Sequence, residues 1–162
     1  MITQEFLKEH LEYRDGHLWC VKKRSKNTVI GSRAGCLYKT GYVYVSVNNK
    51  RIPEHRLIWL YHHGVWPKEF LDHINGIRDD NRIENLREAN NQQNQFNSNS
   101  NTGYSKYKGV CWDKPRQKWR AYYMINGKYK FIGNFDDEVE AALAYDDTVR
   151  KIHGNFTRLN FG

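Results

Sequence analysis

The stretch FLDHINGIRDDNRIENLREANNQQNQFN, residues 70 to 97, decides how the first part of this 162-residue chain folds. It is dense in Asp, Asn and His, the side chains that bind hard divalent cations and move protons near neutral pH. Phe70-Leu71 predicts a strand, and Asn75-Gly76 predicts a sharp turn. Residues 86 to 89 predict a second short strand, and Asn90 predicts the start of a helix. The expected layout is strand, loop, strand and helix.

The same stretch resembles the HNH endonucleases of the phage and intron homing branch. Their motif combines an Asp-His pair, an Asn-Leu pair and a later Asn, which here are Asp72-His73, Asn85-Leu86 and Asn94. Upstream, the resemblance continues through GYVYVSVNNKRIPEHRLIWLYHHGVWP, so that it covers most of residues 13 to 97. A lone Asp-His pair would be explained more simply as part of a polar surface hairpin, but the full motif favours a nuclease.

The resemblance implies a beta-beta-alpha metal fold with one Mg²⁺ or Mn²⁺ bound by the carboxylate of Asp72 and the amide oxygen of Asn94. His73 would be the general base, because neutral imidazole accepts a proton at neutral pH. The metal would stabilise the charge that develops on the phosphate, and cleavage would leave 5′-phosphate and 3′-hydroxyl ends. Asn85 completes the set of catalytic residues, and its amide suits hydrogen bonds to the loop between the strands.

One geometric condition applies to this site. Neighbours on a regular strand point to opposite faces, so Asp72 and His73 can reach one phosphate only if the strand twists or ends there. Asp79 and Asp80 in the following loop are expected to be solvated. His55 and Arg56, at the start of a predicted helix, are candidate supporting residues, although a scaffold role for His55 is equally compatible with the sequence.

The segment before the motif has the signals of a scaffold. Thr3 is a candidate helix cap, and Asp15-Gly16 predicts a tight hairpin turn. Alternating residues 41 to 47 predict a strand that ends at Asn48-Asn49, and residues 54 to 63 predict a helix that closes at Gly64.

Residues 90 to 103 carry no charge and almost no apolar side chain, so we expect a linker at 98–103. Beyond it, KGVCWDK, KWRAYYMI and KYKFIGNF predict three strands, and DDEVEAALAYDDTVRKIHG predicts a helix. The expected buried stripe of that helix consists of Ala142, Tyr145, Val149 and Ile152. Residues 104–135 hold eight Lys or Arg and one acid, whereas 136–151 hold six acids and two bases. The sheet rather than the helix should therefore face phosphate.

This last part resembles the plant APETALA2 (AP2) type of DNA-binding domain, on the segments YKGVCWD, KWRAYY, IGNFDDEVEAALAYDDTVRKIHG and LNF. The resemblance implies a three-stranded sheet in the major groove with the helix packed behind it. By strand alternation, Trp119, Ala121 and Tyr123 should pack on the helix. Cys111 and Met124 depart from the plant pattern. The expected DNA contacts are Lys114, Arg116, Lys118, Arg120, Tyr122, Met124, Lys128, Tyr129 and Phe131.

Composition agrees with a polyanionic partner. The formal net charge is +8 and the pI is about 9.4. No apolar run approaches the roughly 20 residues of a membrane span, and the N-terminus lacks a signal-peptide pattern, so we expect an intracellular protein. The resemblance to the HNH endonucleases implies a phage-encoded protein that acts in the bacterial host cytoplasm. The three cysteines form no C-x-x-C pair, so we expect no structural zinc and interpret them as small buried hydrophobes.

The sequence thus predicts an α+β protein of two small domains. Residues 1–97 form an HNH nuclease domain with its core motif at 55–97, and residues 104–162 form an AP2-like domain, a small three-stranded sheet packed on one helix. The predicted function is metal-dependent endonuclease cleavage of double-stranded DNA, by a monomer or homodimer without an obligate protein partner. Two alternatives stay open: a non-enzymatic DNA-binding regulator with a decayed nuclease fold, and an RNA-binding or RNA-processing protein.

Overall fold

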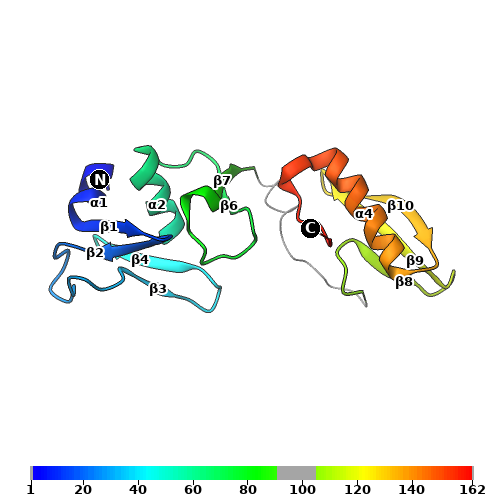
Figure 1. Ribbon diagram of the computed structural model, residues 1–162, viewed down its shortest axis with the longest axis horizontal. Coiled ribbons are helices and arrows are strands. Elements are labelled where there is room, and N and C mark those ends of the chain that lie inside the picture. The colour runs from blue at the N-terminus through cyan, green and yellow to red at the C-terminus, as the bar shows by residue number, and fades with distance from the viewer. Residues whose placement is uncertain (1, 91–104, 162) are drawn as a thin grey trace. The chain divides into compact units, whose positions relative to one another are not determined.

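The computed structural model describes residues 2–90 and 105–161, which belong to two compact units, Met1–Ala89 and Asn90–Gly162 (Figure 1). The first unit contains three antiparallel sheets, β1-β2, β3-β4-β5 and β6-β7. Its elements are α1 Gln4–His10, β1 Leu11–Arg14, β2 His17–Cys20, β3 Gly35–Leu37, β4 Val43–Val47, β5 Lys50–Pro53, α2 Glu54–His63, β6 Phe70–His73, the 3-10 helix η1 Ile83–Asn85 and β7 Leu86–Ala89.

Local sequence signals explain where these elements begin and end. The hydroxyl of Thr3 accepts a hydrogen bond from the backbone N–H of Phe6 at 3.2 Å, which caps α1 as predicted. Asp15 and Gly16 take positive φ angles of 46° and 82° in the two-residue turn of the β1-β2 hairpin. Gly64, with φ of 74°, ends α2.

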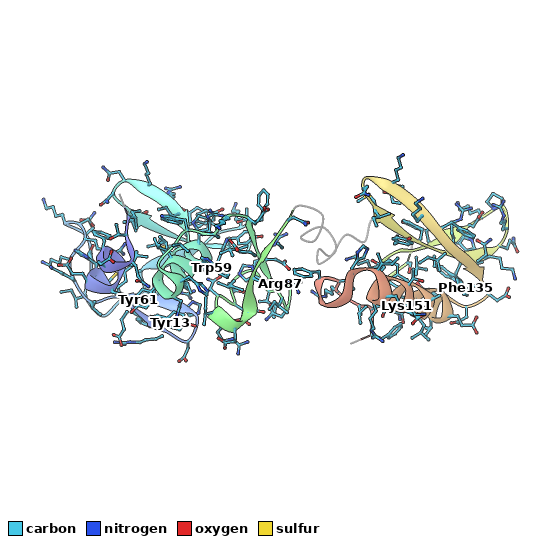
Figure 2. The ribbon with its side chains drawn as sticks, turned by 90° about the horizontal axis from the view of Figure 1, so that it is seen from above. Tyr13, Trp59, Tyr61, Arg87, Phe135 and Lys151 are labelled. Atoms are coloured by element: carbon cyan, nitrogen blue, oxygen red, sulfur yellow. The ribbon has the colours of Figure 1, made fainter. Side chains whose placement is uncertain are left out.

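The core of the first unit lies where both helices meet the strands. Alternation on β4 buries Val45 and Val47 against the apolar face of α2, which contributes Leu57 and Ile58. In Figure 1, α2 lies over β4. Aromatic rings close the edge of this core, among them Tyr13, Trp59 and Tyr61, which Figure 2 labels. The scaffold predicted before the motif is therefore confirmed.

The motif itself forms the hairpin β6-β7, in which Asp72 is opposite Arg87 and His73 is opposite Leu86. β6 includes both Asp72 and His73, each opposite a residue of β7, and ends at His73. Gly76, with φ of 72°, and the bond from its N–H to the carbonyl of His73 at 2.8 Å make the predicted sharp turn. The helix predicted from Asn90 onward falls outside the described residues.

The second unit is a three-stranded antiparallel sheet, in the order β10-β9-β8, with one long helix across one face (Figure 1). Its elements are β8 Val110–Asp113, β9 Lys118–Ile125, β10 Lys128–Phe135, α4 Glu138–His153 and the 3-10 helix η2 Gly154–Phe156. Val110 and Ala121 pack on Ala141 and Ala142 of the helix, with Trp119 beside them. The predicted strands and helix are confirmed.

The predicted stripe on α4 is wrong at one position. Ile152 is 42% exposed, whereas Ala141 is fully buried. Because a helix has 3.6 residues per turn, residues on one face are separated by steps of three or four. After Val149 the next residue on the sheet-facing side is His153, four positions on, whose ring lies edge-on to Tyr123. A step of three from Val149 therefore leads off the buried face.

A buried carboxylate ties the C-terminal segment to α4. Asp146, 4% exposed, accepts hydrogen bonds from the backbone N–H groups of Asn160 and Phe161 at 2.8–2.9 Å. The amide of Asn160 in turn bonds the backbone of Lys108 on both its N–H and its carbonyl. These contacts hold the Leu-Asn-Phe segment against the rest of the sheet unit.

No helix in residues 2–90 or 105–161 combines the length and apolar character that a membrane crossing requires. The interpretation of the cysteines holds for Cys20, which is buried, but is wrong for Cys36, which is exposed. Cys36 lies on β3 opposite Tyr44, whose strand buries only the Val43–Val45–Val47 face, so the pair points away from the core.

We predict that Gly109→Ala strongly destabilises the second unit. Gly109 has φ of 74°, and an added Cβ would lie 2.2 Å from the Tyr145 ring and 2.7 Å from the Tyr122 carbonyl oxygen. A loss of at least about 3 kcal/mol in the free energy of unfolding is expected in chemical denaturation. Gly127→Ala is the matched control, since its φ is 72° but nothing lies within 4 Å. It should cost only about 1 kcal/mol, and equal losses for both variants would contradict this account.

We also predict acid sensitivity of the first unit through His55. This residue is 8% exposed, and burial lowers its pKa to about 3. The unfolded chain protonates near pH 6.5, so it binds more protons than the folded chain below that pH, and stability falls as the pH decreases. Between pH 6.5 and 5 the loss is at most about 2 kcal/mol. Chemical denaturation at both pH values should show a smaller decrease in the free energy of unfolding for His55→Gln than for the exposed-site control His63→Gln. Equal decreases for the two variants would refute this role of His55.

Candidate functional site

Asp72 and His73 lie at the end of β6 and are both buried, at 5% and 4% exposure. The carboxylate of Asp72 is held from the neighbouring strand β7 by Arg87, whose Nε and Nη2 donate to Oδ2 at 2.9 and 2.8 Å (Figure 2 labels Arg87). Such a paired guanidinium lets a buried carboxylate keep its charge. Arg87 therefore holds the carboxylate of Asp72 in one orientation, and it is a site residue that the sequence did not indicate.

His73 is bound on its other side. Its Nε2 lies 2.9 Å from Oδ1 of Asn81, and Nδ2 of Asn81 donates to Oε2 of Glu54 at 2.9 Å. Glu54 is fully buried, and its Oε1 accepts from the backbone N–H of Leu18 at 3.0 Å. A carboxylate only accepts, so the NH₂ group of Asn81 must face Glu54 and its carbonyl oxygen must face His73. The proton of neutral His73 is therefore on Nε2, which makes Nδ1 the basic nitrogen.

The charge of Glu54 is balanced at the bottom of this chain of contacts. Nη2 of Arg33 lies 3.5 Å from Oε2 of Glu54 and 2.7 Å from Nδ1 of His17, which is itself 3.4 Å from the same oxygen. A buried carboxylate without such partners would be strongly destabilising. Four segments distant in sequence thus meet at one side chain: the β1-β2 hairpin, the loop before β3, the start of α2 and the loop after β6.

Aromatic groups enclose the imidazole of His73. The His55 ring lies edge-on at 5.2 Å and the Tyr42 ring at 6.0 Å between centroids, and the guanidinium of Arg78 lies 5.2 Å over the Tyr42 ring. This burial lowers the pKa of His73, while the bond from Asn81 and the charge of Asp72 oppose the change. The neutral, proton-accepting form is therefore favoured at neutral pH.

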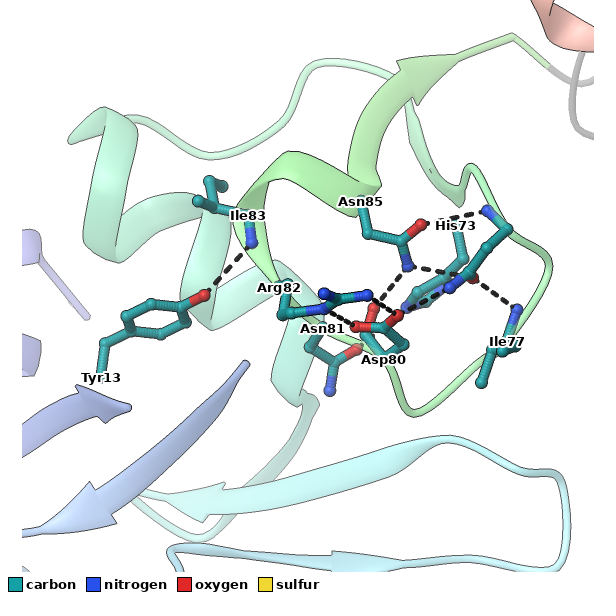
Figure 3. A network of polar contacts seen from close by, with 9 residues as sticks. Tyr13, His73, Ile77, Asp80, Asn81, Arg82, Ile83 and Asn85 are labelled. Carbon is teal, nitrogen blue, oxygen red and sulfur yellow. Dashed lines mark hydrogen bonds and ion pairs between the residues drawn. The ribbon is translucent and has the colours of Figure 1, made fainter. Parts of the chain in front are cut away.

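Asn85 braces the loop between the two strands (Figure 3). Its Oδ1 accepts from the backbone N–H of Asn75 at 3.0 Å, and its Nδ2 donates to Oδ1 of Asn75 at 3.1 Å and to the carbonyl of Asp80 at 2.7 Å. The loop contacts expected for Asn85 are confirmed. Asp80, expected to be solvated, is instead paired with Arg82, which holds the pKa of its carboxyl at about 2.

The remaining predicted residues of this unit divide as follows. His55 contacts His73, and its buried Nδ1 has no hydrogen-bond partner within the described residues. Arg56 is half-buried on α2. Asn94, the second predicted metal ligand, lies outside the described residues. Within residues 2–90 and 105–161 no group of three or more His, Cys, Asp or Glu side chains is placed to hold a metal ion.

The outer face of the C-terminal sheet has the predicted side chains on it. Cys111, Arg120, Tyr122, Tyr129 and Phe131 line a shallow groove of about 420 Å³. Tyr129 and Phe131 are 72% and 61% exposed, and the Tyr122 and Tyr129 rings meet edge-on at 5.3 Å. Trp119 and Ala121 pack toward the helix, so the predicted alternation of faces on β9 is confirmed there. Met124 is half-buried opposite Tyr129.

Most of the predicted phosphate contacts are engaged inside the sheet unit. The carboxylate of Asp113 accepts from both Arg116 and Arg120, and Asp136 accepts from Lys118. The side chains of these three cations are 39–62% exposed. Asp136 is exposed, so its ion pair with Lys118 contributes only about 0–1 kcal/mol and a phosphate group can compete for Lys118. Asp113 is buried and needs its two guanidinium partners, but each arginine uses one nitrogen for this carboxylate and can turn its other N–H groups to a phosphate. The exposed Lys114 and Lys128 complete the set.

Comparison with known proteins assigns both units. Residues 54–96 match the family model described as HNH endonuclease, and residues 105–155 match the AP2 domain. The chain is 34% identical to Protein 3.8 of Escherichia phage T7 over 108 residues, which cover 64% of this chain and 87% of the phage protein. No solved structure matches the chain significantly. With both motifs present and a phage relative covered over most of its length, the chain belongs to the phage HNH endonuclease family and carries an AP2-like domain.

Proposed function

We propose that the protein is a metal-dependent endonuclease that hydrolyses phosphodiester bonds of double-stranded DNA and leaves 5′-phosphate and 3′-hydroxyl ends. The observation that carries this proposal is the buried chain Glu54–Asn81–His73, which holds one imidazole in one tautomer at the residue that follows the buried Asp72. A histidine oriented by an acceptor that is oriented in turn by a carboxylate is the arrangement of a general base. A histidine that serves only packing does not require it.

In this proposal His73 accepts the proton of the attacking water through Nδ1. The hydrogen bond from Nε2–H to Asn81 stabilises the positive charge that develops on the ring as the proton arrives. The neutral Asn81 passes this stabilisation on from the carboxylate of Glu54. Tyr42 and His55 exclude water from the faces of the ring. These residues hold and move one proton, whereas Asn85 holds the loop that brings Asn81 to His73.

The donor chemistry of the site fits a hard divalent cation such as Mg²⁺ or Mn²⁺. The carboxylate oxygens of Asp72 are ligands of the right kind, and Asn94 would add an amide oxygen. With so few protein ligands, most of the coordination shell would consist of water and phosphate oxygens, as Mg²⁺ prefers. When bound, the cation would supply charge stabilisation to the phosphate group and the departing oxygen.

The sheet of the AP2-like domain would hold the duplex. Lys118 would exchange its exposed carboxylate partner for a phosphate, and Arg116 and Arg120 would bind phosphates through N–H groups that Asp113 does not use, which contributes affinity without sequence choice. The exposed rings of Tyr129 and Phe131 suit apolar contact with base edges such as the thymine methyl group. Tethering this grip to the nuclease raises the local concentration of DNA at the site.

The direct test of cleavage uses supercoiled plasmid with Mg²⁺ or Mn²⁺. We expect nicked or linear product with the wild-type protein and none with EDTA. His73→Ala should cleave about 10²–10⁴-fold more slowly, as expected for loss of a general base, and should bind DNA as well as the wild type. Equal rates for both proteins would contradict the role of His73. DNA binding without cleavage of plasmid, phage or host DNA would favour the non-enzymatic regulator.

A double-mutant cycle tests the positioning chain. Asn81→Asp puts two carboxylates in contact and should lower kcat about 10–100-fold, with little change in KM. Adding Glu54→Gln reverses the order of amide and carboxylate. The new amide at position 54 then donates to the new carboxylate at position 81, which still accepts from Nε2–H of His73. We expect the double variant to recover most of the lost kcat in single-turnover assays. A double variant no better than Asn81→Asp would rule out orientation of His73 through this pair.

A further inference from the structure

The positive charge of this chain is concentrated in a segment that neither family model reaches. Residues 21–51 contain eight Lys or Arg and no Asp or Glu. The formal charge of this segment therefore equals the net charge of the whole chain, +8. The two family matches begin at residues 54 and 105. The segment includes β3, β4 and the start of β5, which lie together in the first unit (Figure 1).

The outer face of this sheet is hollowed. On β4 the side chains of Val43, Val45 and Val47 enter the core, so Tyr44 and Ser46 point to the opposite face. That face and the loop before β3 form a largely polar groove of about 700 Å³, which we call the basic groove. Its lining includes Arg24, Arg33, Tyr38, Tyr44, Ser46 and Arg51.

Most of the basic side chains in this segment have no carboxylate partner among the described residues. Within the described residues, two of the eight form ion pairs with carboxylates, Lys22 with Glu9 and Arg33 with Glu54. The other six, Lys23, Arg24, Lys26, Lys39, Lys50 and Arg51, form none there. Six like charges within about 30 residues repel one another, and a polyanion that displaces its own counterions relieves this repulsion.

Two of these cations are held in place at the groove. The guanidinium of Arg24 donates to the carbonyl of Ser46 at 2.8 Å, and that of Arg51 lies 5.6 Å over the Tyr38 ring. The Nε of Arg24 is buried and has no hydrogen-bond partner in the described part of the chain. Less side-chain freedom remains to be lost when such a group binds a phosphate.

The sheet that carries the groove reaches the candidate nuclease site. β4 begins one residue after Tyr42, whose ring contacts His55 and His73, and Arg78 from the motif loop donates to the carbonyl of Thr40 at 2.8 Å. At about 3.3 Å per residue, Ser46 lies about 13 Å along the strand from Tyr42. That length corresponds to about four base-pair steps of duplex DNA.

We propose that the basic groove binds the sugar-phosphate backbone of duplex DNA a few base pairs from the bond that His73 acts on. This inference rests on the proposed function, and it gives the nuclease unit a phosphate-binding surface of its own, separate from the AP2-like domain. The hydroxyl, amide and guanidinium groups of the groove suit contacts with phosphate. Among the described residues, the groove has no helix or exposed two-stranded ribbon whose side chains could contact base edges. Its contribution is therefore to affinity and to the position of the duplex.

The test measures equilibrium binding of the full-length protein to a duplex fragment in EDTA, from about 50 to about 300 mM KCl, a range over which phosphate contacts weaken strongly. Lys50→Gln/Arg51→Gln removes two exposed charges from β5. We expect the slope of log K against log salt to decrease by about 1–2, at roughly 0.9 per lost phosphate contact. The matched control, Arg150→Gln/Lys151→Gln, removes the same charge from exposed positions on α4 and should leave the slope nearly unchanged.

The outcomes separate this inference from the proposed function. Equal slopes for the β5 variant and the wild type, or equal decreases in both double variants, would overturn the groove as a DNA contact even if the wild type cleaves DNA. Because binding is measured in EDTA, failure of cleavage alone leaves the expected slope difference intact. A wild-type protein that binds no duplex would overturn both. Thermal unfolding of the two variants checks that each remains folded.

Discussion

The structure of the nuclease unit depends on the burial of one carboxylate, that of Glu54. A charge removed from water must be fully paired, and this one collects a backbone N–H from β2, the amide of Asn81 and the guanidinium of Arg33. Those partners connect the first hairpin, the long loop, α2 and the motif loop. The same requirement fixes which way Asn81 faces and hence which nitrogen of His73 carries the proton. Stability and chemical competence therefore have a common origin at this residue.

Much of the fold could be predicted from the sequence because its signals are local. Asp15-Gly16, Asn48-Asn49, Gly64 and the alternation on β4 each specify backbone geometry within a few residues, and all are observed. Glu54, Asn81 and Arg87 were not predicted as site residues. Glu54 bonds Asn81 and Leu18, and Arg87 bonds Asp72, across 15 to 36 positions, and no periodicity or spacing signals such contacts. The error at Ile152 has a simpler cause. The predicted buried stripe continued three residues beyond Val149, whereas the buried face of the helix continues four residues beyond it.

The two units differ in whether their basic side chains are paired with carboxylates. In the AP2-like sheet, Arg116, Lys118 and Arg120 already have carboxylate partners, whereas most cations of residues 21–51 have none within the described residues. A pre-paired cation exchanges one anion for another and contributes less net affinity than an unpaired one. The exposed aromatic side chains of the sheet are better suited to discriminate among bases. The proposals above therefore place contact with bases mainly in the second unit and backbone affinity in both.

In the nuclease unit, the Glu54–Asn81 pair holds the proton of neutral His73 on Nε2 and leaves Nδ1 basic, and the proposed chemistry depends on this tautomer. Long-range ¹H–¹⁵N correlation spectra of the imidazole ring, recorded on the full-length protein at neutral pH, distinguish the two tautomers directly. We predict a protonated Nε2 and an unprotonated Nδ1 for His73. A ring protonated on Nδ1 alone would contradict this assignment.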